Sequence, residues 1–383
     1  MMKIKELVSG YWQGLTTAVL AGVVFCVWLF GLPHLMLARE QMQLFLWNTD
    51  YLTERLAVAG GLSQWLGELI VQFFLNPVYG ACWYTLFFVA IQQLTWGLFR
   101  REGVRREGVE YYLLFFLSFV PAFAFCYLWT VMTISMTLTV AFILILLLLN
   151  VVKRFRLVMK LISLVVLIPI GYWLVGSDWN WGSDKVGTYE EMRYDMLLRQ
   201  GRWDAIVKMY QDTGEEERRR EGEGREVEEN QISDEERREM AILNAVRLAA
   251  CSLGQISQQD MMMGLVLTNH ALRDVPSCFI MSEVGLQVGM VNVSQRAAFE
   301  AMEVIPYYNK SARALRRLVE TNIVTGQYDV ALKYIAILEE TLFYRGWARR
   351  MKPLAEHPEM MKDYPYYHRL KEIYDKGKDG FFY

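Results

Sequence analysis

The feature that most constrains this chain is a set of long stretches without any charged residue in its first half. Four such stretches occur, with lengths of 32, 31, 42 and 17 residues: 7–38, 69–99, 111–152 and 161–177. A helix that crosses a bilayer needs about 20 consecutive apolar residues. The first two stretches therefore hold one span each, the third is long enough for two, and the fourth, extended back past Lys160, holds another. We expect five spans, at about 14–34, 78–99, 111–129, 132–150 and 157–175.

Charge divides the chain into two parts. Residues 1–176 carry 12 Lys and Arg and 8 Asp and Glu, whereas residues 177–383 carry 28 and 34. A hydrophobic content of 54% and a mean hydropathy of +0.15 are too high for an ordinary soluble protein. A single soluble domain and overall disorder are therefore excluded. We expect an all-α protein in which a transmembrane domain, 1–176, precedes a soluble domain, 177–383.

The basic residues beside the expected spans predict the orientation. Arg39 and Arg55 lie in the loop after the first span, and ten basic residues lie at the other ends of the spans. These ten are Lys3, Lys5, Arg100, Arg101, Arg105, Arg106, Lys153, Arg154, Arg156 and Lys160. Loops rich in Lys and Arg stay in the cytoplasm, so we expect a cytoplasmic N-terminus and a soluble domain outside it. If 111–152 held only one span, that domain would be cytoplasmic, but the basic cluster at 153–160 would then face outward.

The loop between the first two spans contains an amphipathic segment. Leu62, Trp65, Leu66, Leu69, Ile70, Phe73 and Phe74 recur at helical spacing. This pattern predicts a helix over about 62–75, too short and too polar on one face to cross a bilayer, so we expect it in the membrane interface. Gly60-Gly61 precedes it and Asn76-Pro77 follows, with the proline opening the second span.

These residues also carry a family resemblance. The stretch Gly60-Gly61-Leu62-Ser63-Gln64-Trp65-Leu66, followed by Gln72-Phe73-Phe74, Pro77 and Gly80, resembles an uncharacterised bacterial family of multi-pass membrane proteins, domain of unknown function 6057. The resemblance covers the whole chain and brings no assigned chemistry. It implies a bacterial inner membrane, and hence a periplasmic C-terminal domain. Members of the family are usually longer, which implies a further C-terminal portion.

The second half contains repeated helix-turn signals. Gly201-Arg202-Trp203-Asp204-Ala205 and Gly326-Gln327-Tyr328-Asp329-Val330-Ala331 both resemble the turn and second helix of a tetratricopeptide unit, and weaker copies are centred on Gly254 and Gly289. The spacings of 35 and 37 residues along Gly254, Gly289 and Gly326 are close to the period of about 34 for this repeat. We expect a tetratricopeptide-like domain, with Ala205 and Ala331 buried where paired helices approach closely; an irregular helical bundle is the alternative.

A charged insertion separates the first two repeat signals. Residues 214–238 contain 11 acidic residues and 6 arginines in 25 positions. Such a segment buries too little apolar surface to offset the entropy of ordering it. We expect a flexible loop or a solvated extension of a helix, and its net negative charge argues against nucleic acid as a partner.

Few residues fit a metal, cofactor or disulfide site. The four histidines, His34, His270, His357 and His368, form no i, i+4 pair, and no nucleotide-binding motif accompanies a strand. We therefore expect no metal and no cofactor. Cys251 and Cys278 would form a disulfide if both faced an oxidising compartment, although each also fits an apolar helix position.

One constellation of polar residues suggests catalysis. Asp50, Glu54 and Arg55 lie in the first external loop, just before the amphipathic helix. Multi-pass glycosyltransferases that use lipid-linked sugars place acidic residues in such a loop, where a carboxylate acts as a general base or holds a metal at the membrane surface. The simpler interpretation is a local ion pair and a helix cap.

Two functions follow from this organisation. The favoured one is a non-enzymatic, membrane-anchored scaffold of the cell envelope, with the lipid bilayer as one partner. Its helical repeats would present a surface that binds a protein or peptide outside the cytoplasm. The alternative is a membrane glycosyltransferase-like enzyme that acts on a lipid-linked substrate through Asp50 or Glu54.

Overall fold

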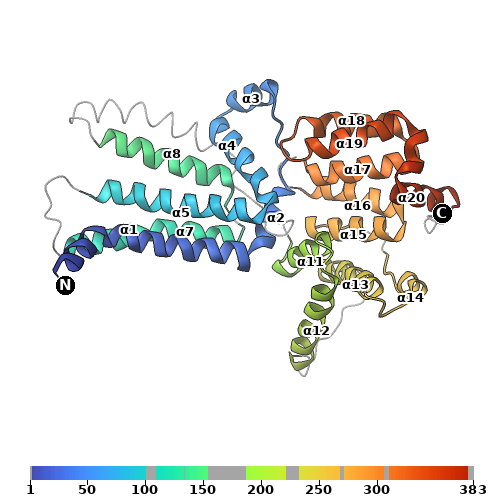
Figure 1. Cartoon of the computed structure of the whole chain (residues 1–383), viewed down its shortest axis with the longest axis horizontal. Coiled ribbons are helices and arrows are strands. Elements are labelled where there is room, and N and C mark those ends of the chain that lie inside the picture. The colour runs from blue at the N-terminus through green and yellow to red at the C-terminus, as the bar shows by residue number, and fades with distance from the viewer. Residues whose placement is uncertain are drawn as a thin grey trace. The chain divides into compact units, whose positions relative to one another are not determined.

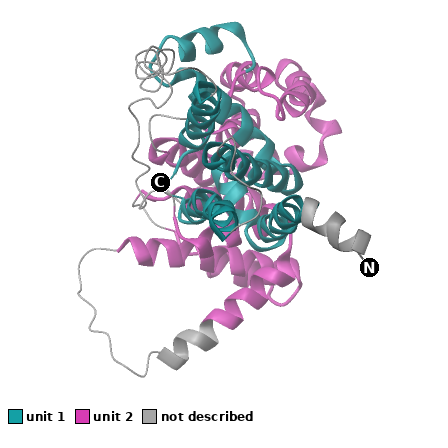
Figure 2. Cartoon of the chain, turned by 90° about the vertical axis from the view of Figure 1, so that its left-hand side faces the viewer, with its two compact units in different colours: residues 1–40, 47–182 teal, residues 41–46, 183–383 magenta. Residues whose placement is uncertain are grey.

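The structure, a computed structural model, describes residues 2–100, 109–132, 134–153, 187–220, 233–267, 271–305 and 310–377. Every regular element in these ranges is a helix (Figure 1). Contacts divide the chain into two units, shown in different colours in Figure 2. Unit 1 comprises residues 1–40 and 47–182, and unit 2 comprises residues 41–46 and 183–383.

Unit 1 contains four long apolar helical stretches, and a set of short helices connects the first stretch to the second. The bounds are α1 Met2–Cys26, the π-helical turn η1 Val27–Gly31, α2 Pro33–Glu40, α3 Thr49–Leu56, α4 Gly61–Gln72, η2 Phe73–Leu75, α5 Pro77–Phe99, α6 Val109–Leu117, α7 Phe119–Thr130 and α8 Met136–Val152. Asn76 caps α5 by accepting a hydrogen bond from Val78 N at 2.9 Å. Pro77 follows in the first turn, where its missing N–H costs nothing.

Two helical stretches are long and apolar enough to cross a membrane, judged by length and composition alone. They are Tyr11–Gly31 and Val109–Thr130, at the first and third predicted spans. The second predicted span is helix α5, which is not among the stretches that meet these criteria, and the fourth is α8, an apolar helix of 17 residues. The fifth, at 157–175, lies outside the described residues. The described helices therefore include two candidate spans by these criteria, and the other three predicted spans stay predictions.

Unit 1 is held together by an aromatic core. The rings of Trp28 and Tyr84 stack with centroids 3.8 Å apart, and Trp129 lies 4.8 Å from Tyr84. Beside this core Arg39, only 1% exposed, donates hydrogen bonds to the carbonyls of Trp129 (3.1 Å) and Ile134 (2.8 Å). A cation at these carbonyls complements the negative end of the α7 dipole. Arg39 therefore fixes the turn between α7 and α8.

Polar side chains also connect the long helices of unit 1. Gln92 on α5 donates to Ser118 Oγ at 2.9 Å, and Thr17 on α1 donates to Gln92 Oε1 at 3.4 Å. Lys153, just after α8, donates to the carbonyls of Gly97 (2.7 Å) and Leu98 (2.8 Å) in the last turn of α5. Helices α5 and α8 therefore end on the same side of unit 1.

Unit 2 consists of successive helix pairs. The bounds are α11 Tyr189–Arg199, α12 Trp203–Arg220, α13 Asp234–Ser252, α14 Gln258–Met263, α15 Val275–Val288, α16 Val291–Val304, α17 Ala312–Thr325, α18 Tyr328–Glu339, α19 Arg345–Glu356, η4 Pro358–Asp363 and α20 Pro365–Asp375. The turns within the first four pairs share a glycine in the left-handed region, with φ of 65°, 71°, 89° and 81° at Gly201, Gly254, Gly289 and Gly326. A side chain at such a position would strain the backbone, which explains the recurrent glycine in the sequence.

The two alanines expected at close helix contacts differ. Ala331 on α18 is fully buried, as predicted, whereas Ala205 on α12 is only half-buried. The buried position on α12 is Ile206, one residue later. The prediction for Ala205 is therefore wrong. Ile206 lies five residues after Gly201, as Ala331 lies five residues after Gly326, so Ile206 and not Ala205 occupies the position equivalent to Ala331.

Buried ion pairs connect the helices of unit 2. Arg313 on α17 makes two hydrogen bonds to Asp195 on α11, at 2.7 and 2.8 Å. The same guanidinium donates to Gln41 at 2.6 Å, in the short segment 41–46 that belongs to this unit. Arg317, also on α17, pairs with Glu283 on α15 and with Glu320 at 3.3 Å.

The described parts of the charged insertion match the alternative of a helix extension, and the two cysteines form no disulfide. Residues 214–220 continue α12, and residues 234–238 form the first turns of α13, so the insertion at 214–238 is helical at both ends. Residues 221–232 lie outside the described part of the chain. Cys251 and Cys278 are both free thiols, so of the two alternatives the structure has the apolar helix positions and not the disulfide. Cys278 is fully buried and acts as a small apolar residue in α15.

Candidate functional site

The sequence-predicted residues Asp50, Glu54 and Arg55 all lie on α3 but do not act together. Asp50 and Glu54 are exposed, and the helix is capped by Asn48, which accepts from Tyr51 N at 2.7 Å. The expected local ion pair and cap are therefore wrong. The actual partner of Arg55 is Glu68 on α4, with Nε 3.1 Å from Oε2.

Glu68 is the centre of a buried polar cluster between α3 and α4. It is 2% exposed and accepts hydrogen bonds from Tyr51 Oη (2.6 Å), Arg55 Nε (3.1 Å) and Gln64 Nε2 (3.0 Å). Burial raises the pKa of Glu68, and these three donors oppose the increase. These hydrogen bonds connect α3 and α4, so the cluster fastens the two helices together.

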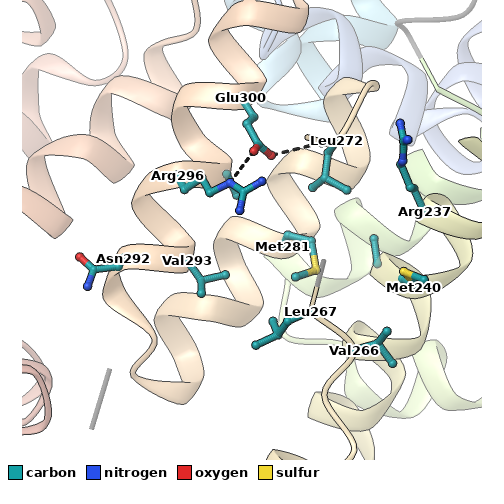
Figure 3. A pocket seen from close by; sticks show the side chains of 12 residues that line it. Arg237, Met240, Val266, Leu267, Leu272, Met281, Asn292, Val293, Arg296 and Glu300 are labelled. Carbon is teal, nitrogen blue, oxygen red and sulfur yellow. Dashed lines mark hydrogen bonds and ion pairs between the residues drawn. The ribbon is translucent and has the colours of Figure 1, made fainter. Parts of the chain in front are cut away.

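A cavity in unit 2 offers more room for a ligand. It has a volume of about 430 Å³ and is formed by α13, α15, α16 and the loop between α14 and α15 (Figure 3). Its lining residues are Arg237, Met240, Ala241, Val266, Leu267, Leu272, Met281, Asn292, Val293, Arg296, Ala297 and Glu300. We call it the α13–α16 cavity. Its size lies within the range of about 300–1,000 Å³ typical of ligand sites.

Helical spacing explains how the sequence builds two of its walls. Arg237, Met240 and Ala241 occupy one face of α13, and Val293, Arg296, Ala297 and Glu300 occupy one face of α16. The small side chains of Ala241 and Ala297, both buried, leave space between these helices. The interior is therefore apolar, with charged residues at its edges.

The loop that forms the third wall is pinned at two points. The Asn244 side chain, fully buried on α13, donates to Val266 O at 2.7 Å and accepts from Val266 N at 2.9 Å. At the other end, Leu272 N donates to Glu300 Oε2 at 3.3 Å (Figure 3). Buried polar groups that are fully paired rigidify their surroundings, so these two contacts hold the wall in place.

A pair of buried carboxylates lies at the base of this loop. Asp274 caps α15 and Glu191 caps α11, and Arg238 Nε lies 3.9 Å from the first and 3.3 Å from the second. Burial, with a smaller contribution from the charge of Asp274, raises the pKa of Glu191 to about 7. Burial also raises the pKa of Asp274. Arg238 is therefore the cation that lies near both carboxyl groups, Glu191 and Asp274.

The described residues contain no group of three or more His, Cys, Asp or Glu side chains arranged to hold a metal ion. His357 and His368 lie near single glutamates, with Nδ1 3.3 Å from Glu359 and 3.8 Å from Glu372. His34 is buried in α2, and His270 lies outside the described ranges.

Sequence reasoning missed both the cavity and Glu68. Arg237 falls within the predicted charged insertion, yet Ser233 and Glu236 form a capping box that starts α13 just before it. This Ser-x-x-Glu signature is readable from sequence and would have placed Arg237, Met240 and Ala241 on one helix face. The closing of the cavity by α15 and α16 has no comparable local signal.

No curated protein and no solved structure is significantly similar to the chain. The Family of unknown function (DUF6057) matches residues 10–181 and 177–383. These two matches together span nearly the whole chain, including the Gly60–Gly80 stretch that carries the resemblance. The chain therefore belongs to the Family of unknown function (DUF6057).

Proposed function

We propose that this protein is a membrane-anchored helical-repeat scaffold of the bacterial cell envelope. In this proposal unit 2 lies outside the cytoplasm and binds a peptide segment of a partner protein in the α13–α16 cavity. The observation that carries the proposal is the cavity itself, which is apolar inside, bordered by charged groups, and held open by pinned walls. Peptide recognition commonly uses such apolar pockets with a few fixed polar groups.

Apolar stripes on unit 1 support the membrane anchor. On α1 and η1 the exposed side chains recur every three to four residues: Tyr11, Leu15, Val19, Val23, Val27 and Phe30. A second stripe follows α6 and α7: Val109, Tyr112, Leu113, Phe116, Leu117, Val120, Phe123 and Tyr127. Contiguous exposed apolar faces of this length suit lipid contact. We infer that α5, α8 and residues 157–175 complete a five-span anchor.

The left-handed glycines support a tetratricopeptide-like reading of unit 2. Gly289 and Gly326 close two consecutive helix pairs, α15–α16 and α17–α18, at the spacing such a repeat requires. Helical repeats stack neighbour on neighbour and create surfaces that bind extended segments. The α13–α16 cavity lies between successive pairs of this kind.

The enzymatic alternative lacks a comparable observation. Asp50 and Glu54 are exposed and line no part of the α13–α16 cavity. Arg55 is engaged with Glu68 and Tyr51. We therefore propose the scaffold alone.

Site-specific photocrosslinking in the native membrane tests the scaffold. A benzophenone side chain at Leu267, which lines the cavity, should yield an adduct to one segment of one protein, identified by mass spectrometry. Val293→Trp should abolish the adduct because the indole fills the cavity. The matched variant Gln295→Trp, on the same helix but outside the lining, should leave it unchanged. An adduct that survives Val293→Trp, or no adduct at all, would refute the proposal.

A further inference from the structure

The lining of the α13–α16 cavity includes three charged residues, and each of them already has a counter-ion. Arg296 and Glu300 both line the cavity, and Arg296 Nε donates to Glu300 Oε1 at 2.7 Å (Figure 3). Arg237, the third charged residue of the lining, donates from Nη1 to Asp234 Oδ1 at 3.1 Å. Arg273 also approaches Asp234, at 3.7 Å, but it is exposed and does not line the cavity. The lining therefore offers a ligand no charge that lacks a counter-ion.

This balance of charge determines which ligands the cavity favours. An ionised side chain that enters an apolar cavity loses its water, and this loss is costly unless an opposite charge replaces it. A ligand carboxylate at Arg296 would lie beside the carboxylate of Glu300, and a ligand ammonium at Glu300 would lie beside the guanidinium of Arg296. Repulsion from the second group therefore offsets attraction to the first. An uncharged ligand avoids both costs.

The apolar part of the lining is both accessible and large. Four of its side chains are only half-buried, so a ligand in the cavity can contact them: Met240, Val266, Leu267 and Val293. An engineered apolar cavity of about 150 Å³ is large enough to bind benzene, and this cavity has a volume of about 430 Å³. At least two large apolar side chains of a bound segment therefore fit inside it.

We propose that the cavity binds an uncharged peptide segment through two neighbouring large apolar side chains, such as leucine, methionine or phenylalanine. These side chains fill the interior, and the Arg296–Glu300 pair disfavours segments that bring an ionised side chain into it. The unbranched side chain of Met240 adapts to apolar groups of different shape, so the preference is for a class of side chain and not for one residue. This inference rests on the proposed peptide-binding function and specifies the class of peptide.

A small peptide set tests this preference on the full chain in lipid nanodiscs, where no detergent competes for an apolar cavity. Fluorescent peptides carry a central pair of leucine, methionine or phenylalanine residues between glycine and serine, and binding is followed by anisotropy. In matched peptides one residue of the pair is asparagine, aspartate or lysine. At least one apolar peptide should bind, and its aspartate counterpart should bind about tenfold or more weakly than its asparagine counterpart, which differs only in charge. Raising the salt concentration about tenfold should change the affinity of the apolar peptide by less than about twofold, because no ion pair forms.

Variants then assign the preference to the paired charges of the lining. In Glu300→Gln the amide retains an acceptor for Leu272 N, which Glu300 Oε2 accepts at 3.3 Å, but the carboxylate beside Arg296 is lost. The aspartate peptide should then bind at least as tightly as its asparagine counterpart. Glu303→Gln is the matched control, because Glu303 is exposed on the same helix and does not line the cavity, and it should keep the preference. Val293→Trp should remove all binding.

The outcomes separate this inference from the function on which it rests. Aspartate peptides that bind the unmodified chain as tightly as asparagine peptides, still blocked by Val293→Trp, overturn the uncharged preference and leave the peptide scaffold standing. An unchanged aspartate penalty in Glu300→Gln overturns the role of the Arg296–Glu300 pair. Binding that Val293→Trp does not affect overturns both the inference and the scaffold. If no peptide of the set binds, the inference fails, and the crosslink from Leu267 decides the scaffold separately.

Discussion

Arg313 donates hydrogen bonds to residues from distant parts of the chain. Its guanidinium contacts Asp195 and Gln41 and lies over the ring of Phe279 at 4.4 Å. Both members of the Arg313–Asp195 pair are buried, at 8% and 3% exposure. Removal of one partner from such a pair leaves an uncompensated charge in a poorly solvated site, which is far more costly than loss of an exposed pair.

Arg313→Met should therefore destabilise the protein by about 3–5 kcal/mol. The lost bidentate contact leaves the Asp195 carboxylate buried without a cation. Thermal unfolding of the full chain in detergent, followed by circular dichroism, measures the effect. The control is Lys371→Met, which breaks the exposed Lys371–Asp375 pair (3.2 Å) and should cost less than about 0.5 kcal/mol. Equal losses in the two variants would contradict the buried-pair account.

Glu191 makes the free energy of unfolding depend on pH. Burial and the charge of Asp274 raise the pKa of Glu191 from 4.5 to about 7. The folded state therefore holds this proton at pH values where the unfolded state has lost it. Stability from this group is greatest at low pH and decreases as the pH rises from about 4.5 to about 7.

Glu191→Gln should flatten the pH dependence of the melting temperature over this interval. The amide retains the acceptor that receives Thr188 N, so the cap survives while the titration is removed. Glu236→Gln is the matched control because Glu236 has the same capping role on α13 but is exposed. Each unit of pKa difference corresponds to about 1.4 kcal/mol. Identical pH profiles for wild type and Glu191→Gln would contradict the assignment.

Substitutions on helix α18 test how this helix packs in unit 2. Ala331 is fully buried, whereas Ala336 on the same helix is exposed. Ala331→Glu should cost about 3–5 kcal/mol, because it places a charge without a partner in the helix contact. Ala336→Glu introduces the same group into solvent and should change the melting temperature of the full chain little. A small effect at both positions would mean that α18 does not pack as described.

The helix boundaries were the most predictable part of the fold, because their signals are local. Asn76-Pro77 begins α5, and Gly326 ends α17, as the residue types require. The partners of buried charges were not predictable, since Glu68 lies 13 residues from Arg55 and Asp195 lies 118 residues from Arg313. The error at Ala205 has a different origin, because the two alanines were equated although the residue five positions after Gly201, as Ala331 is after Gly326, is Ile206.

The candidate site depended even more on long-range structure. The α13–α16 cavity is lined by residues of α13, such as Ala241, and of α16, such as Ala297, which are separated in the sequence by α14 and α15. No pattern within α13 or α16 alone indicates the empty space. Asp50 and Glu54 attracted attention through their position in the sequence, but their exposure separates them from the buried cluster of Glu68.

At the scale of the whole molecule, the direction of the helices in unit 1 supports the proposed topology. Lys153 binds the last carbonyls of α5, whereas Arg39 binds the turn between α7 and α8. Helices α5 and α8 thus end at one side, and α7 ends at the other. In the sequence, ten basic residues adjoin the span ends that we propose to be cytoplasmic, and only Arg39 and Arg55 lie in the loop that we propose to be external.

Reporter fusions test this orientation directly. Alkaline phosphatase fused after Lys185 should be active, because the enzyme folds only outside the cytoplasm. Fusions after Arg106 and after Arg156 should be inactive, and they serve as internal controls for each other. An inactive fusion after Lys185, with activity after Arg156, would place unit 2 in the cytoplasm and refute the envelope scaffold.

The segment 41–46 has a consequence for how this protein is made. It is translated well before the rest of unit 2, which resumes only at residue 183. Until then Met42 and Phe45, at 1% and 0% exposure in the finished structure, lack their final surroundings, and Gln41 lacks Arg313. A fragment that begins at residue 183 lacks Met42 and Phe45 from its own core. We therefore expect unit 2 to reach its full packing only when its last helices, once translated, receive a segment that was made far earlier.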